Sequence, residues 1–284
     1  MSKHEPGGVL TVPAAQLSSS AATDASASNH DQHDAADERL LDIYRRWFEV
    51  APANTPDLLT EAFRLRYQVY CVENAFEDPA DNVDGLERDD FDDRAVHSLL
   101  IHRPSGAVAG TVRLVLPDPE NPKRSFAIQE ICDDPVLDDP ARFPIGKMAE
   151  ISRFSISKTF RRRQGDTLYG ITDGPRLTPA EERRIAPHMT LGLMEAQMRM
   201  SVENDISYLC AAMEPKLLRL LSRLGLHFHP IGSLVNFHGW RQPCVIEIKS
   251  FLERLKQERQ DVWEVITDDG KHWQVLCRNL AASA

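Results

Sequence analysis

Apolar side chains recur every three or four positions in five segments of the chain, and this is the period of an amphipathic helix. The segments are residues 40–48, 55–70, 185–203, 214–224 and 251–260. Thr55 followed by Pro56 predicts a capped start for the second helix, and Gly225 predicts the end of the fourth. The third segment carries an apolar stripe, which favours a face packed in the core over a special acyl-binding surface. This stripe consists of Met189, Leu193, Ala196 and Met200.

Shorter apolar runs bounded by turn residues predict five strands. They lie at residues 95–101, 107–116, 148–157, 208–213 and 244–248. Pro104-Ser105-Gly106 separates the first two runs, which predicts a β-hairpin. Because helices and strands are interleaved along the chain, the pattern predicts an α/β fold with a mixed central sheet and helices on both faces.

The domain boundaries follow from where this pattern begins and ends. Residues 1–37 are rich in Ser, Ala, Asp and His and poor in large apolar residues. Such a segment cannot bury enough surface to offset the entropy lost on ordering, so we expect a disordered N-terminal tail. Residues 38–284 are then expected to form one domain, in which residues 160–180, basic and then polar, form an inserted loop.

A chain that starts at Glu38 is therefore expected to melt at the same temperature as the full-length chain, because the tail contributes no buried apolar surface. Thermal unfolding of the two chains, followed by calorimetry, tests this. A clear drop in the melting temperature of the shorter chain would show that the tail packs against the domain.

Composition narrows the class of protein. The 284 residues carry a net charge of −10, so binding of nucleic acid through bulk electrostatics is not expected, although a local basic patch could still bind an anionic carrier. The five cysteines are scattered without a Cys-x-x-Cys pair, which favours reduced, mostly buried thiols and a cytoplasmic protein. No apolar run is long enough to predict a membrane span, and the N-terminus shows no signal-peptide core.

The first candidate for chemistry is an acidic loop at residues 77–93, whose centre reads Asp89-Asp90-Phe91-Asp92. It could be a solvated charge run, or a wall that attracts a protonated amine substrate. A calcium loop fits poorly, since Val83 occupies a position where a ligand is needed. Crowded carboxylates repel one another unless a cation lies among them, and Arg66 on the preceding helix could be that cation.

The second candidate is Glu150-Ile151-Ser152-Arg153-Phe154 in the predicted strand 148–157. Regular alternation would place Glu150, Ser152 and Phe154 on one face and Ile151 and Arg153 on the other. A base, a hydroxyl and a cation in one strand fit a reacting centre, although an ion pair at a sheet edge would look the same. Arg113 lies among apolar residues of another predicted strand, so we expect it to pair with an acidic residue.

The third candidate is the basic run Arg161-Arg162-Arg163, which could bind phosphate or be a solvated turn. Other chemistries find little support. The chain has no Gly-x-Ser-x-Gly elbow, no Walker loop and no Gly-x-Gly-x-x-Gly, which argues against serine hydrolases and nucleotide-binding folds. His227, His229 and His238 are close in sequence, but a structural or surface role is favoured over zinc.

Taken in order, four blocks resemble the motifs of acyl-homoserine lactone synthases and N-acyl amino acid synthases. The blocks are Leu65-Arg66-Tyr67-Gln68-Val69-Tyr70, Asp89-Asp90-Phe91-Asp92, Gly110-Thr111-Val112-Arg113-Leu114 and Glu150-Ile151-Ser152-Arg153-Phe154. With the further stretches Cys71-Val72-Glu73 and Phe160-Arg161-Arg162-Arg163, the wording is similar to the PEP-CTERM/exosortase system-associated acyltransferases. The resemblance is strong over about residues 63–165, and the four blocks in one order are more specific than any one alone.

The resemblance implies a GNAT (acyl-coenzyme A N-acyltransferase) fold, in which two splayed central strands admit the pantetheine arm of the donor. It implies an enzyme that transfers a long-chain fatty acyl group from acyl carrier protein or coenzyme A to an amino acid-like amine, with no metal or redox cofactor. Carried over by position, Glu150, Ser152 and Arg153 would be catalytic, and Arg66, Asp89, Asp92 and Arg113 would bind substrate. Arg161, Arg162 and Arg163 would bind the donor.

One feature of the sequence departs from the general GNAT pattern. Residues 161–165 match the usual pyrophosphate loop of GNAT enzymes poorly, which favours a carrier protein as donor. Two other functions stay open: an autoinducer synthase that makes a lactone from S-adenosylmethionine, and a non-catalytic GNAT-like module that binds acyl carriers or partner proteins.

Overall fold

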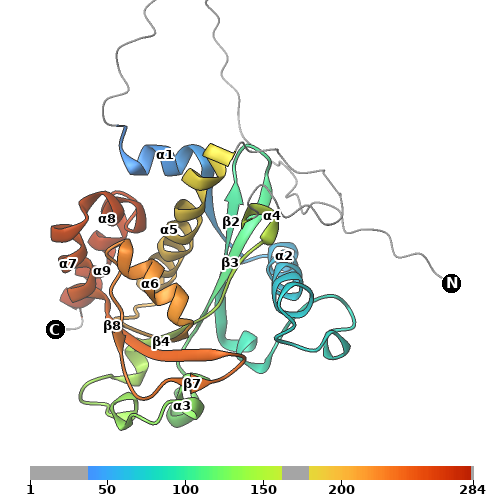
Figure 1. Cartoon of the computed structure of the whole chain (residues 1–284). Helices are drawn as coiled ribbons and strands as arrows, with labels where there is room; N and C mark the ends of the chain where they lie inside the picture. Colours follow the sequence, from blue (N-terminus) through green and yellow to red (C-terminus); the bar gives the residue numbers. More distant parts are fainter. Residues whose placement is uncertain (1–37, 162–178, 283–284) are drawn as a thin grey trace, which may run out of the picture.

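The computed structural model describes residues 38–161 and 179–282, and a mixed β-sheet runs through its centre (Figure 1). The eight-stranded sheet has the order β1-β2-β3-β4-β5-β8-β6, with β7 paired to β8. β4 and β5 run parallel, and every other pair of neighbouring strands is antiparallel. The strands are β1 (Phe48–Pro52), β2 (Ala95–His102), β3 (Ala107–Val115), β4 (Met148–Ile156), β5 (Tyr208–Met213), β6 (His229–Pro230), β7 (Val235–Asn236) and β8 (Trp240–Glu247).

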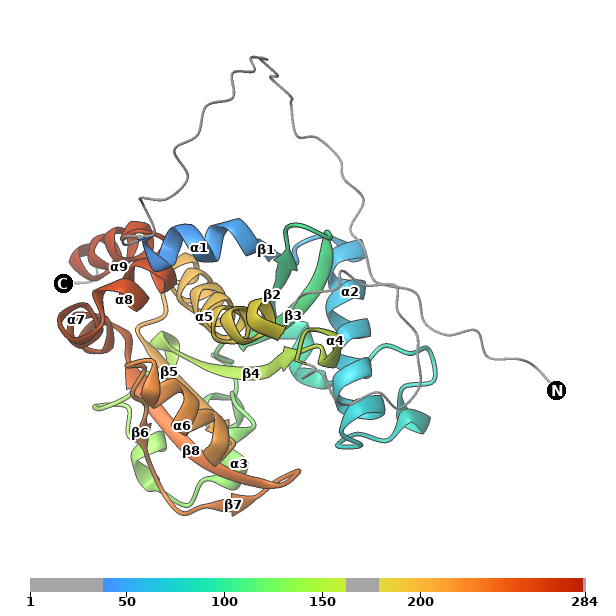
Figure 2. The same ribbon diagram turned by 45° about the horizontal axis from the view of Figure 1, so that its top comes forward.

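Helices cover both faces of the sheet, as the sequence pattern predicts (Figure 2). The main core lies on the face covered by α1 (Leu40–Trp47), α5 (Pro179–Glu203), α6 (Pro215–Arg223), α7 (Ile248–Glu258), α8 (Gln260–Ile266) and α9 (Lys271–Ala282). The other face carries two smaller cores. One packs under α2 (Pro56–Tyr67), and the other packs beside α3 (Ile128–Ile131).

The stripe predicted for the third helix is buried in the main core, which confirms it as a packing surface. Its members Met189, Leu193, Ala196 and Met200 are at most 3% exposed. The helix lies against β1, β2 and β3, and every residue of β3 is buried.

The helix α2 begins where its sequence predicts, and the helical path continues through the predicted end at Tyr70, but the α-helix itself ends at Tyr67. The Thr55 hydroxyl accepts a hydrogen bond from the Leu58 amide at 3.4 Å, and Pro56 occupies the first turn. Beyond Tyr67 the chain continues as a π-helix, η1 (Gln68–Glu73), a wider coil that is common near functional sites. The wide turn leads into Asn74, which lines the cavity described below.

Four sequence predictions need correction. Phe48 does not continue the first helix; it opens β1 and pairs with His102 of β2. The last strand begins four residues earlier than predicted, at Trp240, and Ile248 belongs to α7. The predicted end of α7 at residue 260 is wrong, since Gln260 opens α8. The helices α8 and α9 were not predicted.

Several of the connections between these helices and strands contain a single helical turn. The turns are η2 (Pro79–Asp81), η3 (Asp90–Arg94), η4 (Pro122–Arg124), η5 (Pro135–Asp138), η6 (Ile145–Lys147) and the short helix α4 (Lys158–Arg161).

The five cysteines are free, and three of them are buried. Among the described helices, none combines the length and apolar character needed to cross a membrane. The tail 1–37 and residues 162–178 of the inserted loop lie outside the described ranges.

Candidate active site

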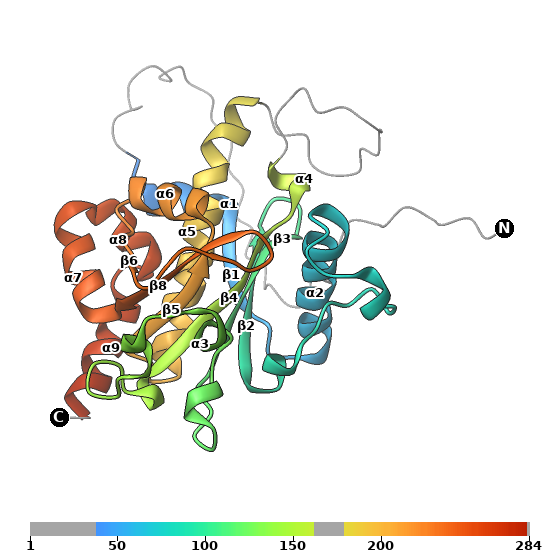
Figure 3. The ribbon, with the colours of Figure 1, turned by 60° about the horizontal axis from the view of Figure 1, so that its bottom comes forward.

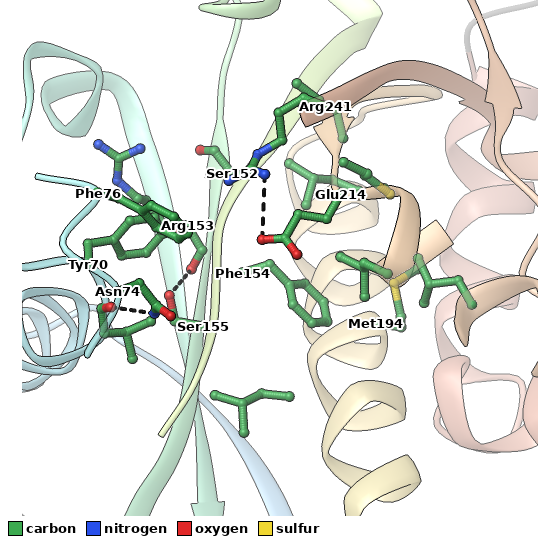
Figure 4. Close-up of a pocket in the computed structure, with 18 residues that line it drawn as sticks. Tyr70, Asn74, Phe76, Ser152, Arg153, Phe154, Ser155, Met194, Glu214 and Arg241 are labelled. Atoms are coloured by element: carbon green, nitrogen blue, oxygen red, sulfur yellow. Dashed lines mark hydrogen bonds and ion pairs between the residues drawn. The ribbon is translucent and has the colours of Figure 1, made fainter. Parts of the chain in front are cut away.

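The central parallel pair of strands separates soon after it begins. In the described part of the chain, β4 pairs with β5 at Met148, Ala149 and Glu150 alone, although β4 runs on to Ile156 and β5 to Met213. Beyond this pairing the two strands diverge, and a cavity of about 260 Å³ opens between them (Figure 4). The backbone groups on the facing edges are therefore available to pair with a bound molecule.

The walls of the cavity differ in character. The helices α5 and α6 contribute apolar side chains, namely Met194, Leu217 and Leu221. Tyr70, Asn74 and Phe76 follow α2 on the opposite side, and β4 supplies a polar edge with Ser152, Arg153 and Ser155. Glu214 and Arg241 complete the lining from the side of β5 and β8. A cavity with one apolar wall and one polar edge suits a ligand that has both a chain and a polar head.

Next to this cavity, three arginines and three carboxylates form an interlocked group, which we call the acid–arginine cluster. Its members are Arg66, Glu87, Asp89, Asp92, Arg113 and Arg153. Arg66 and Arg113 are almost inaccessible to solvent. Buried charges of this kind persist only when paired and hydrogen-bonded, and the sequence prediction that Arg66 and Arg113 pair with acidic residues is confirmed.

Asp92 links two of the arginines. Arg66 donates two hydrogen bonds to the Asp92 carboxylate, from Nη1 to Oδ1 at 2.7 Å and from Nη2 to Oδ2 at 3.0 Å. Arg113 Nη1 donates a third, to Oδ1 at 2.8 Å. Burial alone would raise the pKa of Asp92, but the hydrogen bonds and charges of Arg66 and Arg113 outweigh burial and hold this pKa far below its usual range. Asp92 therefore stays ionised at physiological pH.

Asp89 and Asp92 also shape the acidic loop itself. The Asp89 amide donates to Asp92 Oδ2 at 2.9 Å, and the Phe91 amide donates to Asp89 Oδ1 at 2.9 Å, forming a capping box around η3. These two carboxylates are therefore not solvated charges; they are occupied by arginines and backbone amides.

Arg113 and Arg153 connect the cluster to β4. Arg113 Nε donates to Ser152 Oγ at 2.9 Å, while its terminal nitrogens contact Asp89. Arg153 Nη2 donates to Glu87 Oε1 at 2.8 Å and to Asp89 Oδ2 at 2.9 Å, and its guanidinium lies over the Tyr70 ring. The cluster thus fixes the positions of Ser152 and Arg153, two of the β4 residues that line the cavity.

The backbone of β4 is irregular at Arg153. Thr111 pairs with Ser155 and Arg113 with Ser152, so Arg153 and Phe154 face a single residue of β3, and Arg153 has a positive φ of 51°. The bulge breaks the predicted alternation: Phe154 packs with Ile151 on the main core, while Glu150 faces Ile128 in the α3 core. Bulges re-aim side chains, and this one lets consecutive residues Ser152 and Arg153 both reach the acid–arginine cluster.

Glu150 lies behind the cavity rather than in its wall. It is 5% exposed and accepts a hydrogen bond from the Ile128 amide at 3.3 Å. Burial raises its pKa to about 7, since backbone hydrogen bonds and the charges of Arg113 and Arg153 offset only part of the desolvation. A carboxyl with this pKa can take up or release a proton near neutral pH.

Among the described residues, the predicted site residues fall into two groups. Ser152 and Arg153 line the cavity, whereas Arg66, Asp89, Asp92, Arg113 and Glu150 lie outside its lining. Direct contact of the second group with substrate stays a prediction. The donor-binding prediction for Arg161, Arg162 and Arg163 concerns side chains outside the described ones.

Sequence reasoning missed several residues of this site. Glu87 binds both Arg66 and Arg153, and it is as buried as the arginines, yet nothing local distinguishes it from the neighbouring acids. His97 lies 3.5 Å from Asp92, and burial together with the charge of Arg66 lowers its pKa to about 4. A histidine in a predicted strand, paired in register with Arg113, was the available signal.

The histidines considered for zinc have other surroundings. His227 lies near Glu258, and His238 Nδ1 lies 2.9 Å from the Phe76 carbonyl oxygen. Within residues 38–161 and 179–282, no group of three or more His, Cys, Asp or Glu side chains is arranged to hold a metal ion.

The sequence and the fold were compared with known protein families and solved structures. Residues 65–170 match the family described as the acetyltransferase (GNAT) domain. Among solved structures, TofI, in a ternary complex with an inhibitor and MTA, is 20% identical with a TM-score of 0.50, over 74% of this chain and 96% of that one. FeeM, an N-acyl amino acid synthase from uncultured soil microbes, is 17% identical with a TM-score of 0.49, over 74% of this chain and 96% of that one. Among curated proteins, none matches the sequence.

These findings agree with the topology. The chain has the GNAT fold, with a mixed sheet and helices on both faces, as the sequence predicts. Its GNAT domain makes it an enzyme of the acyltransferase type. The matched segment contains η3, β3 and β4, all six residues of the acid–arginine cluster and one edge of the cavity.

Proposed function

We propose that the chain is an N-acyltransferase that moves a long-chain fatty acyl group from a thioester carrier to the amine of an amino acid-like acceptor. The observation that carries this proposal is the cavity between β4 and β5, which places an apolar wall opposite the polar residues of the β4 edge. The acyl chain would lie against Met194, Leu217 and Leu221, and the reacting groups would meet near Ser152 and Arg153.

The donor would enter along the separated strand edges. A pantetheine arm carries amide groups, and an exposed strand edge binds such groups by adding them as a further strand. Backbone N–H groups of β4 would then lie beside the thioester carbonyl and stabilise the oxyanion that forms when the amine attacks. In this reaction a C–N bond forms and the C–S bond breaks, while the acceptor ammonium releases protons and the leaving thiolate takes one up.

The proton would pass to Glu150. An amine attacks a thioester only when neutral, and the carboxyl of Glu150, with a pKa of about 7, is suited to accept its proton. Because Glu150 lies behind the cavity lining, we propose that a water molecule connects it to the amine. Ser152 would orient that water, and Arg113 holds the Ser152 hydroxyl in place at 2.9 Å.

In this proposal, Arg66, Asp89, Asp92 and Arg113 serve the acceptor side by fixing Ser152 and Arg153. The acid–arginine cluster is balanced in charge, so its effect on a substrate comes from the positions it imposes rather than from a net negative wall. No metal or redox cofactor enters the proposed reaction.

The donor would be an acyl carrier protein, with coenzyme A as the alternative. Replacing Arg161, Arg162 and Arg163 together by Ala is expected to weaken transfer from acyl carrier protein more than transfer from acyl-coenzyme A, since carrier proteins are acidic and dock through basic patches. Turnover with the two donors at low and moderate salt gives the comparison. Equal losses with both donors would mean that the arginines bind only the shared phosphopantetheine.

Lipid mass spectrometry of cells that overproduce the chain tests the proposal as a whole. A new acyl amino acid supports it, and an acyl lactone would instead support an autoinducer synthase that uses S-adenosylmethionine. No new lipid would favour a non-catalytic module that binds acyl carriers. The scattered cysteines favour a cytoplasmic protein, and the sequence resemblance suggests that it acts in the PEP-CTERM/exosortase system, which the presence of exosortase-system genes beside its own gene would test.

A further inference from the structure

Arg241 lines the cavity opposite the acid–arginine cluster, and its guanidinium is held firmly. Nη2 donates to the His238 carbonyl at 2.8 Å, Nη1 donates to the Trp240 carbonyl at 3.2 Å, and the group lies over the Phe76 ring at 5.5 Å (Figure 4). Its side chain is 14% exposed. The Arg241 guanidinium is therefore fixed in position, largely shielded from solvent and directed at the cavity.

Glu214 faces Arg241 across a loose contact. It is the residue directly after β5 and before α6, and its Oε1 lies 3.5 Å from Arg241 Nη1. Charge-assisted hydrogen bonds are usually about 2.7–2.9 Å long, so this pair is not closed. The Glu214 side chain is 46% exposed and can move without losing a buried partner.

The other arginine in the cavity wall differs in this respect. Arg153 is committed to Glu87 and Asp89, with Glu77 at 3.5 Å, and has little capacity left for a further carboxylate. Arg66 and Arg113 are buried and bound to Asp92. Among the described arginines of this region, Arg241 is the one whose carboxylate contact is open and faces the cavity.

We propose that Arg241 and Glu214 bind the two charged groups of the acceptor: Arg241 the carboxylate of an amino acid, and Glu214 its ammonium group. This inference rests on the proposed N-acyltransferase function and specifies its substrate class. A zwitterion would replace the loose contact between the two side chains with two complementary ones. The acceptor nitrogen would then approach Ser152 from the β5 side of the separated strands, where the proposed water molecule could reach it.

Arg241 and Glu214 would each bind a different charged group of the substrate, so their contributions can be measured separately. A methyl ester of an amino acid keeps the ammonium group and loses the carboxylate, so Arg241 should distinguish the acid from its ester while Glu214 should not. Loss of a hydrogen bond to a charged group commonly weakens binding by roughly 10- to 100-fold.

The test uses the full chain with hexadecanoyl-acyl carrier protein and, separately, hexadecanoyl-coenzyme A as donors and the twenty standard amino acids as acceptors, with products identified by mass spectrometry. For the amino acid consumed, KM is then measured for the acid and for its methyl ester. Arg241→Gln is expected to raise KM for the acid by roughly 10- to 100-fold and to leave KM for the ester within about twofold. Glu214→Gln is expected to raise both KM values.

Two further variants guard against a loss of folding. Arg241→Lys keeps the charge but not the two-pronged geometry, so it should restore part of the affinity for the acid. Arg219 is an exposed arginine of α6, the helix that follows Glu214, and Arg219→Gln should change neither KM. Equal effects of Arg241→Gln on acid and ester, or none on either, would overturn the inference while leaving the proposed function intact. If cells yield an acylated amine that is not an amino acid, the inference and the proposed acceptor class fail together while N-acyl transfer stands; if no amine is acylated, N-acyl transfer fails as well.

Discussion

Replacing Asp92 by Asn is expected to lower the free energy of unfolding by about 3 kcal/mol and to reduce turnover sharply. The amide keeps the shape of the side chain but removes the charge that Arg66 and Arg113 share, and both guanidiniums are almost fully buried. An under-compensated arginine in a dry site costs about 3–5 kcal/mol when its partner is lost. Turnover should fall because Ser152 and Arg153 would no longer be held by the acid–arginine cluster.

Asp93→Asn is the matched control for this change. Asp93 lies on the same helical turn and is exposed, so its loss should change stability by under about 0.5 kcal/mol. Urea unfolding and turnover of both variants give the comparison. The double change Asp92→Asn with Arg113→Gln should cost less stability than the two single changes added, since the two side chains are in contact. Strict additivity, with full activity in Asp92→Asn, would return the acidic loop to a run of solvated charges.

The difference in stability between the parent chain and the Asp92→Asn variant should depend on pH. The pKa of Asp92 is lower in the folded chain than in the unfolded chain, so its contribution is present at pH values above the usual pKa of an aspartate and is lost as the pH falls. The gap in stability between the parent chain and Asp92→Asn should therefore narrow below about pH 4.

The half of the site that contains the cluster could be predicted from the sequence, because buried charge is costly and each member therefore implies a partner. Arg113 lies in a strand that is buried throughout, so an acidic partner was required, and Asp89 and Asp92 supply it. Glu87 could not be separated from its neighbours in the same way. It is selected by its position between Arg66 and Arg153, which depends on the path of the whole loop.

The opposite half of the site could not be predicted. Glu214 and Arg241 reach the cavity only because β5 pairs with β4 and β8 pairs with β5, which are contacts between distant parts of the chain. The bulge at Arg153 was hidden for a similar reason. Its cause is the register between β3 and β4, and the local sequence reads as a regular strand.

Most elements of the fold could be predicted from periodicity, and two of those that were missed, β1 and α8, are short or defined by their partners. β1 is the edge strand of the sheet, and Figure 3 shows it beside β2. It has five residues without alternating burial, so its pairing with β2, and not its pattern, makes it a strand. The seven residues of α8 are too few to show a helical period, although four of them are buried in the main core.

Replacing Glu150 by Gln is expected to lower turnover by roughly 10²- to 10⁴-fold, the usual contribution of a general base. The fold should survive, because the amide oxygen can still accept the hydrogen bond from the Ile128 amide. Above pH 7 the parent chain should be fully active with Glu150 ionised, and its turnover should fall as the pH drops through about 7. The residual activity of the Gln variant should lack this step.

Stability should change in the opposite direction to activity. The folded-state pKa of Glu150 is raised from 4.5 to about 7, so its protonated form stabilises the fold at low pH and that contribution is lost as the pH rises through about 7. The Gln variant has no such loss, so relative to the parent chain it should gain up to roughly 3 kcal/mol between pH 4 and pH 8. Urea unfolding at the two pH values measures this gain, with the exposed Glu120→Gln as control. A Gln variant with near-normal turnover but the expected gain in stability would show that Glu150 titrates in the core and that another group takes the proton from the amine.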